Sequence, residues 1–147
     1  MPHNFVAPEW FGGERLFVHR KGAAPALGPS ALVGTPYAYT GQPVIVPGSM
    51  GADTWLLAGL DGNEATLRSA PHGAGRAAPR GTMSGMSDAE FDASLGRTLL
   101  VHPGLERPKG EAPAAYKDIG PIIGAVVTAG LARPVARFRP MLTCKEG

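Results

Sequence analysis

The clearest pattern of hydrophobic and polar positions lies near the end of the chain, in residues 119–129. Its apolar side chains are spaced i, i+3, i+4, i+7 and i+8, at Ile119, Ile122, Ile123, Val126 and Val127. This spacing places them on one face of an α-helix. Asp118 can cap the first turn and Gly130 can end the last, so the pattern predicts a helix over 119–129.

Shorter apolar runs predict strands, at residues 15–19, 54–60, 98–102 and 135–139 and at the start of 42–51. An Asp-Gly turn signal follows 54–60 and precedes 64–70, and it predicts that these two segments form a hairpin. Ser87 and Glu90 have the spacing of a capping box, which predicts a short helix that ends near Leu95.

Glycine and proline are the unusual part of the composition, with 21 Gly and 15 Pro among 147 residues. They favour many short elements joined by shaped loops over a helical bundle. The hydrophobic fraction of 44% and the charged fraction of 18% are typical of a globular protein. We therefore expect one α+β domain over residues 1–147, with a mixed sheet and a few helices.

Charge and cysteine content exclude several classes of protein. A net charge of +2 excludes a polybasic tail, and the single Cys144 excludes an internal disulfide and a Cys-rich zinc site. No stretch approaches the roughly 18 apolar residues of a membrane helix. The first ten residues lack the pattern of a signal peptide, so we expect a cytoplasmic protein with no membrane contact.

Two glycine-rich segments are candidates for anion binding. In "VPGSMGADT", Gly48 and Gly51 allow close backbone approach, and Ser49 and Thr54 add hydroxyl groups. A tight turn between strands is the alternative, and the spacing alone favours the turn.

The segment "HGAGR" opens with His72 and is the second candidate. A neutral imidazole is a possible nucleophile near pH 7, and a helix starting at Gly73 would bring Arg76 and Arg80 to one phosphate. The alternative is a loop histidine beside two solvated arginines.

Weaker candidates lie at both ends of the chain. His3 is a possible metal ligand and Asn4 its neighbour, although a lone histidine near a terminus more often has no such role. His19, Arg20 and Lys21 form a basic cluster that suits phosphates or a solvated strand end, and composition alone favours the solvated strand end. Tyr116 is a candidate for stacking on a base, and Lys145 lies in what is usually a frayed tail.

These blocks become specific through their order. "PHN", "VHRKGA", "GQPVIVPGSMG", "HGAGR", "EAPAAYKD" and "VARFRP" with a closing lysine follow one another along essentially the whole chain. In this order they resemble the RtcB family, GTP-dependent ligases that join RNA 3′-phosphate or 2′,3′-cyclic phosphate ends to 5′-hydroxyl ends in tRNA splicing or RNA repair. The resemblance covers the C-terminal, nucleotide-binding part of the family and implies the corresponding portion of its fold.

The resemblance implies a role for each block. His72 matches the histidine that takes GMP from GTP, and His3 matches a ligand of one of two manganese ions. Guanine-nucleotide contacts are implied for Asn4, Ser49, Thr54, His72, Ala74, Gly75, Tyr116 and Lys145. Less specific phosphate or RNA contacts are implied for Arg76 and Arg80, and the basic Arg20 and Lys21 stay candidates for the same ligands.

The chain also departs from the family pattern. Pro79 stands where the family usually has serine, and Asp53 replaces a small residue, so its carboxylate is expected to weaken phosphate binding by repulsion. The family's N-terminal part supplies most metal ligands, and without them we expect inefficient self-guanylylation. Three hypotheses stay open: part of an RNA ligase, a subunit completed by a separate N-terminal half, and a non-catalytic remnant that binds guanine nucleotide or RNA.

Overall fold

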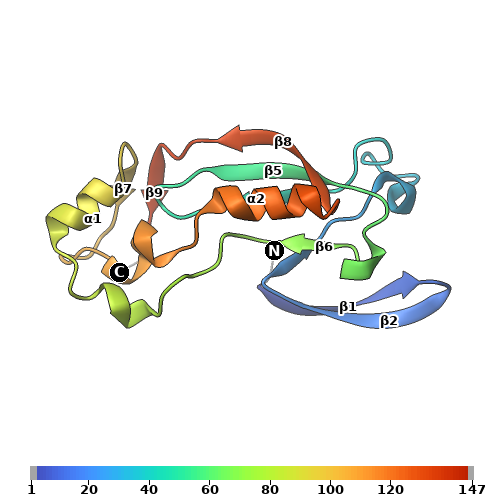
Figure 1. Ribbon diagram of the computed structural model, residues 1–147, viewed down its shortest axis with the longest axis horizontal. Helices are drawn as coiled ribbons and strands as arrows, with labels where there is room; N and C mark the ends of the chain where they lie inside the picture. Colours follow the sequence, from blue (N-terminus) through green and yellow to red (C-terminus); the bar gives the residue numbers. More distant parts are fainter. Residues whose placement is uncertain (1–2, 146–147) are drawn as a thin grey trace.

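The computed structural model describes residues 3–145, apart from the side chain of Arg80. In this range two α-helices accompany four small sheets. A three-stranded sheet and helix α2 lie along the middle of an elongated molecule (Figure 1). The β1–β2 hairpin lies at one end, and α1 lies at the other beside β7 and β9 (Figure 1). This arrangement confirms the expected α+β class.

Most of the strands are short, and several of the strand pairings join segments that lie far apart in the sequence. The central antiparallel sheet has the order β4-β5-β8, from β4 (Pro43–Pro47), β5 (Thr54–Gly59) and β8 (Ala132–Phe138). The others pair β1 (Asn4–Phe11) with β2 (Glu14–Lys21), β3 (Ala23–Pro25) with β6 (Ser69–Pro71), and β7 (Leu99–Val101) with β9 (Leu142–Cys144), of which only the last pair is parallel.

The main core lies between the central sheet and α2. Strand β4 alternates, with Val44 and Val46 buried and Ile45 exposed, so one face of the sheet contributes to the core. Leu57 in β5 is fully buried. A smaller cluster around Phe91 packs α1 (Asp88–Ser94) against the neighbouring loops.

Helix α2 (Ile119–Thr128) confirms the predicted helix. The Asp118 side chain accepts a hydrogen bond of 3.0 Å from the Gly120 backbone N–H and so caps the first turn. Ile123 and Val126 face the core. Gly130 has a φ of +66°, the left-handed conformation that commonly follows a helix end.

Helix α1 confirms the predicted capping box. The Ser87 hydroxyl accepts from the Glu90 N–H at 3.2 Å, and the Glu90 carboxylate accepts from the Ser87 N–H at 2.8 Å. Short 3₁₀ turns complete the described structure: η1 (Pro29–Leu32), η2 (Glu64–Thr66), η3 (Arg80–Met83), η4 (Lys109–Glu111) and η5 (Pro113–Ala115).

The predicted hairpin of 54–60 with 64–70 is wrong. Strand β5 pairs with β4 and β8 instead, while β6 pairs with β3. The buried Asn63 side chain explains the change of direction, because its amide donates to the carbonyls of Ala26 and Leu131. It anchors the turn to two other segments and directs the chain away from β5.

The possible helix start at Gly73 is also absent. Gly75 has a φ of +70°, and Arg76 forms an isolated antiparallel bridge with Tyr116. Arg76 and Arg80 are therefore not one helical turn apart, and the expected pair on a helix face does not form.

Candidate functional site

His72 and His3 lie side by side, although 69 positions separate them in the chain. Their ring centroids are 4.7 Å apart and the rings meet edge to face at 89°. Gly22 connects the two backbones, since its N–H donates to the His3 carbonyl and its carbonyl accepts from the His72 N–H. Pairing of β1 with β2 and of β3 with β6 therefore brings the two histidines together.

A cavity of about 410 Å³ opens in front of His72. The Ala74 N–H donates to the Pro47 carbonyl at 3.0 Å, which fixes the "HGAGR" loop against the end of β4. The cavity wall includes His3, Gly48, Gly73, Gly75, Arg76 and Tyr116. Small residues here leave the backbone accessible, as an anion site requires.

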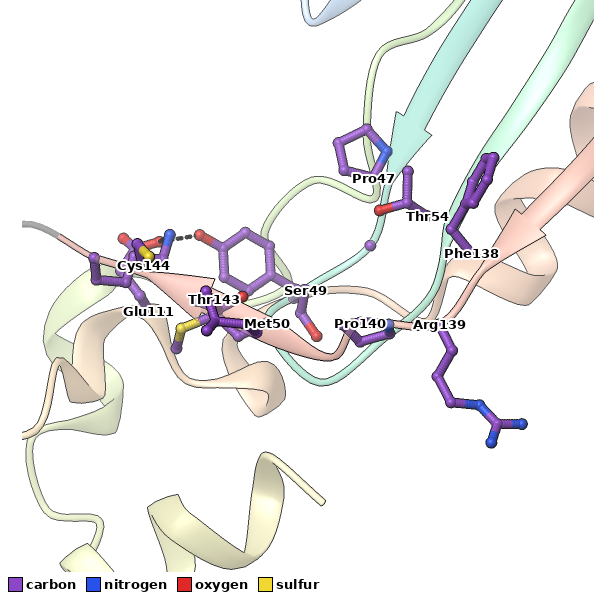
Figure 2. A pocket seen from close by; sticks show the side chains of 14 residues that line it. Pro47, Ser49, Met50, Thr54, Glu111, Phe138, Arg139, Pro140, Thr143 and Cys144 are labelled. Carbon is purple, nitrogen blue, oxygen red and sulfur yellow. Dashed lines mark hydrogen bonds and ion pairs between the residues drawn. The ribbon is translucent and has the colours of Figure 1, made fainter. Parts of the chain in front are cut away.

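A second cleft of about 380 Å³ adjoins the first, because Pro47, Gly48 and Tyr116 line both. It brings together four residues implied as nucleotide contacts, Ser49, Thr54, Tyr116 and Lys145. In Figure 2, Thr54 lies toward one end of the cleft and Glu111 toward the other. Most of the predicted nucleotide contacts thus fall into two adjoining hollows, with His72 in one and Lys145 in the other.

The "PGSMG" segment is both a turn and a cleft wall. It joins β4 to β5, as the turn hypothesis expected, and the Gly48 N–H donates to the Asp53 carbonyl at 3.1 Å. A Cβ on Gly48 would lie 2.7 Å from that carbonyl oxygen, so glycine is required. The same turn places Ser49 in the second cleft.

Glu111 is a site residue that the sequence analysis did not single out. Its carboxylate accepts from the Tyr116 hydroxyl, lies 3.3 Å from Arg76 Nη1 and lies 3.9 Å from Lys145 Nζ. The only signal in the sequence is its place at the start of "EAPAAYKD". Burial first, and then the Glu111 carboxylate, raise the pKa of Tyr116 above its ordinary 10.0.

Arg76 carries an unsatisfied donor beside His72. Its Nε donates to the Ala78 carbonyl at 3.0 Å and its guanidinium lies over the Tyr116 ring, 5.2 Å from the centroid. Its Nη2 is buried with no hydrogen-bond partner. Buried donors are nearly always paired, so this nitrogen is an exception among the side chains that the structure describes.

Other predicted residues lie outside both hollows. Arg20 is 2% exposed, and its guanidinium donates to Glu9, Ser69 and the Leu67 carbonyl, which makes it a structural residue of the hairpin base. Lys21 is exposed at the end of β2.

Asn4 Oδ1 accepts a hydrogen bond of 2.5 Å from His19 Nε2 across the same hairpin, and Asn4 lines neither hollow. The backbone of Arg80 begins η3, and its side chain lies outside the described structure.

Asp53 does not face the nucleotide hollows. Its carboxylate is 14% exposed and forms an ion pair with Arg137, which in turn lies over Trp55. The Arg137 guanidinium offsets the charge of this carboxylate, and the expected repulsion of a phosphate by Asp53 stays a prediction.

Residues 3–145 do not fit a complete manganese site. No group of three or more His, Cys, Asp or Glu side chains that suits a metal ion occurs among them, and His3 has only His72 as a histidine neighbour. In the same range no helix is long and apolar enough to cross a membrane.

Comparisons with known proteins agree on one family. A family model described as "tRNA-splicing ligase RtcB" matches residues 1–146. RNA-splicing ligase RtcB2 of Escherichia coli is 40% identical over 98% of this chain, and RNA-splicing ligase RtcB of Mycobacterium bovis is 42% identical over 88%. The tRNA-splicing ligase RtcB of Pyrococcus furiosus is 40% identical over 89%. The chain spans 36%, 31% and 14% of these three relatives, respectively.

Proposed function

Because the chain belongs to the RtcB family, we propose that it is the nucleotide-binding part of an RNA ligase that uses GTP. The ligase would join an RNA 3′-phosphate, or 2′,3′-cyclic phosphate, to a 5′-hydroxyl. The observation that carries this proposal is the pair of adjoining hollows, which gathers His72, Tyr116 and Lys145 from distant segments.

His72 is the proposed nucleophile. One nitrogen of its neutral imidazole forms a bond to the α-phosphorus of GTP while the bond to the β-phosphate oxygen breaks and pyrophosphate leaves. GMP is then transferred from His72 to the RNA 3′-phosphate. The RNA 5′-hydroxyl attacks this activated phosphate and displaces GMP. The unpaired Nη2 of Arg76 and the Gly73–Gly75 backbone support a phosphate position next to this imidazole.

The second hollow is the proposed place of the guanosine. Tyr116 offers a ring for stacking on the base, and Lys145 offers a cationic donor to it. Ser49 and Thr54 add hydroxyl groups to the lining of the same cleft.

Manganese would neutralise phosphate charge during this reaction. His3 is the proposed single ligand from this chain, and the described residues do not complete the site. We therefore expect efficient self-guanylylation only when further metal ligands are supplied.

A second candidate function is that of a subunit completed by an N-terminal half. The observation that favours it is the apolar surface of the β1–β2 hairpin, where Val6 is 58%, Trp10 65% and Phe17 71% exposed. Apolar side chains clustered on one hairpin are typical of a surface that another chain covers.

Mass spectrometry after incubation with GTP and manganese tests the proposal. The chain is incubated alone and with an N-terminal half from a related protein, and GMP is sought on His72. We expect a strong adduct in the complemented mixture, its loss in His72→Ala, and its retention in the control His19→Ala, whose side chain lines neither hollow. GTP binding with no adduct in either mixture would instead support the non-catalytic remnant.

A further inference from the structure

The Glu111 carboxylate lies where three separate segments of the chain meet. Tyr116 reaches it from the segment before α2, Arg76 from the "HGAGR" loop and Lys145 from the end of β9. We infer that Glu111 is a positioning residue that holds these three side chains in the orientation needed to receive guanosine and its phosphate. This inference rests on the proposed nucleotide site.

The contacts of Glu111 divide between the two hollows. Oε2 accepts from the Tyr116 hydroxyl and lies 3.9 Å from Lys145 Nζ, both of which line the second cleft. Oε1 lies 3.3 Å from Nη1 of Arg76, which lines the cavity of His72. One side chain thus connects the proposed base end of the site with its proposed phosphate end.

The charges explain why a carboxylate is needed at this point. Arg76 and Lys145 both direct positive charge toward the Tyr116 hydroxyl region, and an anion between them offsets their repulsion. The Tyr116 hydroxyl is partly desolvated and needs an acceptor. Only an anionic acceptor satisfies the two cations and the hydroxyl together.

The orientation of the Tyr116 ring depends most strongly on this arrangement. Its hydroxyl donates a hydrogen bond to Glu111. The Arg76 guanidinium lies over one face of the ring, 5.2 Å from the ring centroid. A ring held in this way has little rotational freedom left to lose when a base stacks on it. Removing the carboxylate should therefore weaken nucleotide binding without altering the chemistry of His72.

The first test compares Glu111→Gln with Glu14→Gln, a control on the exposed hairpin. Isothermal titration of each full-length chain with GTP in the presence of manganese gives the affinity. We expect Glu111→Gln to raise the Kd about tenfold, as for loss of one charged hydrogen bond, and Glu14→Gln to leave it unchanged. Circular dichroism checks that both variants are folded.

The second test separates positioning from general structure through the Tyr116 hydroxyl. Tyrosinate absorbance is titrated with pH, and the spectrum of Tyr116→Phe is subtracted to isolate Tyr116 from Tyr37 and Tyr39. Glu111→Gln should lower the pKa of Tyr116. In the Tyr116→Phe background Glu111→Gln should cost less GTP affinity, because part of its role is already removed.

The outcomes distinguish the two proposals. If the unaltered chain binds no GTP, the proposed function fails. If the unaltered chain binds GTP but Glu111→Gln has the same Kd and the same Tyr116 pKa, the positioning role of Glu111 is overturned while the proposed function stands.

Discussion

At the scale of single residues, Tyr116 and Arg76 in the candidate site contact each other through their flat groups and contact neighbours through their polar ends. Tyr116 lies beneath the Arg76 guanidinium and donates its hydroxyl to Glu111, so its orientation depends on both neighbours. Arg76 keeps a buried Nη2 without a partner, a cost that a bound phosphate oxygen would remove. The orientation of the Tyr116 ring is thus fixed by its neighbours, while Arg76 carries the free-energy cost of one unmade hydrogen bond.

Tyr116 should make the stability of the chain depend on alkaline pH. Its pKa is raised in the folded chain, so the folded state keeps the phenol proton over a pH range in which the unfolded state loses it. The stabilisation is fully present below the ordinary pKa of 10.0 and is lost as pH rises through the higher folded value. Urea unfolding at several pH values should show this decline.

Tyr116→Phe is the matched control for the alkaline decline. It keeps the ring and removes the ionisable hydroxyl, so its stability should fall less steeply above pH 10.0 than that of the unaltered chain. Equal slopes for the two chains would contradict the assigned role of the hydroxyl.

Most helices and strands in this chain are short, so the contacts at their ends contribute much of their stability. Helix α1 has seven residues and depends on its reciprocal Ser87–Glu90 cap, while α2 has ten and is anchored by Asp118 and by core packing. The hydrogen bonds from Ser87 lower the pKa of Glu90, so the cap is weakened when acid protonates that carboxylate.

Ser87→Ala should destabilise the chain by about 1 kcal/mol, the usual cost of losing a serine N-cap. The Glu90 N–H then loses the hydroxyl that accepts from it at 3.2 Å. Urea unfolding followed by circular dichroism measures the change. Ser30→Ala, outside both helices, serves as the comparison, and a Ser87→Ala stability equal to the unaltered chain would contradict the cap's contribution.

The whole molecule is elongated, and many of its large hydrophobic side chains are exposed. The β1–β2 hairpin lies at one end of the molecule (Figure 1). It exposes Trp10 and Phe17, and the central sheet exposes Ile45 and Val135. A domain of this length can bury only a modest core by itself. The hairpin surface is therefore the place where association with another chain can be tested.

Replacing Trp10 and Phe17 together by serine should reduce association, because it removes apolar surface from the hairpin end. Light scattering coupled to gel filtration should show a lower average mass, or weaker binding of an added N-terminal half. Val33→Ser changes an 81% exposed residue outside the hairpin and should have no such effect. An unchanged mass and unchanged binding for the double variant would show that the hairpin is not an interface.

Local sequence signals predicted the features that depend on residues close together in the chain. The spacing of Ile119 to Val127, the Asp118 cap and the Ser87–Glu90 box each act within about two helical turns, so helices α1 and α2 could be predicted. The order of the motifs predicted the family, and the residues of one motif identified His72 as a candidate.

Only the tertiary structure decided which strands pair and which side chains meet. The Asp-Gly turn signal could not reveal that Asn63 binds the carbonyls of Ala26 and Leu131, and so the hairpin prediction failed. The approach of His3 to His72 and the meeting of Glu111 with Lys145 likewise depend on contacts across more than thirty positions. Such contacts form because sheet pairing and core burial act on the whole chain, and no short stretch of sequence records them.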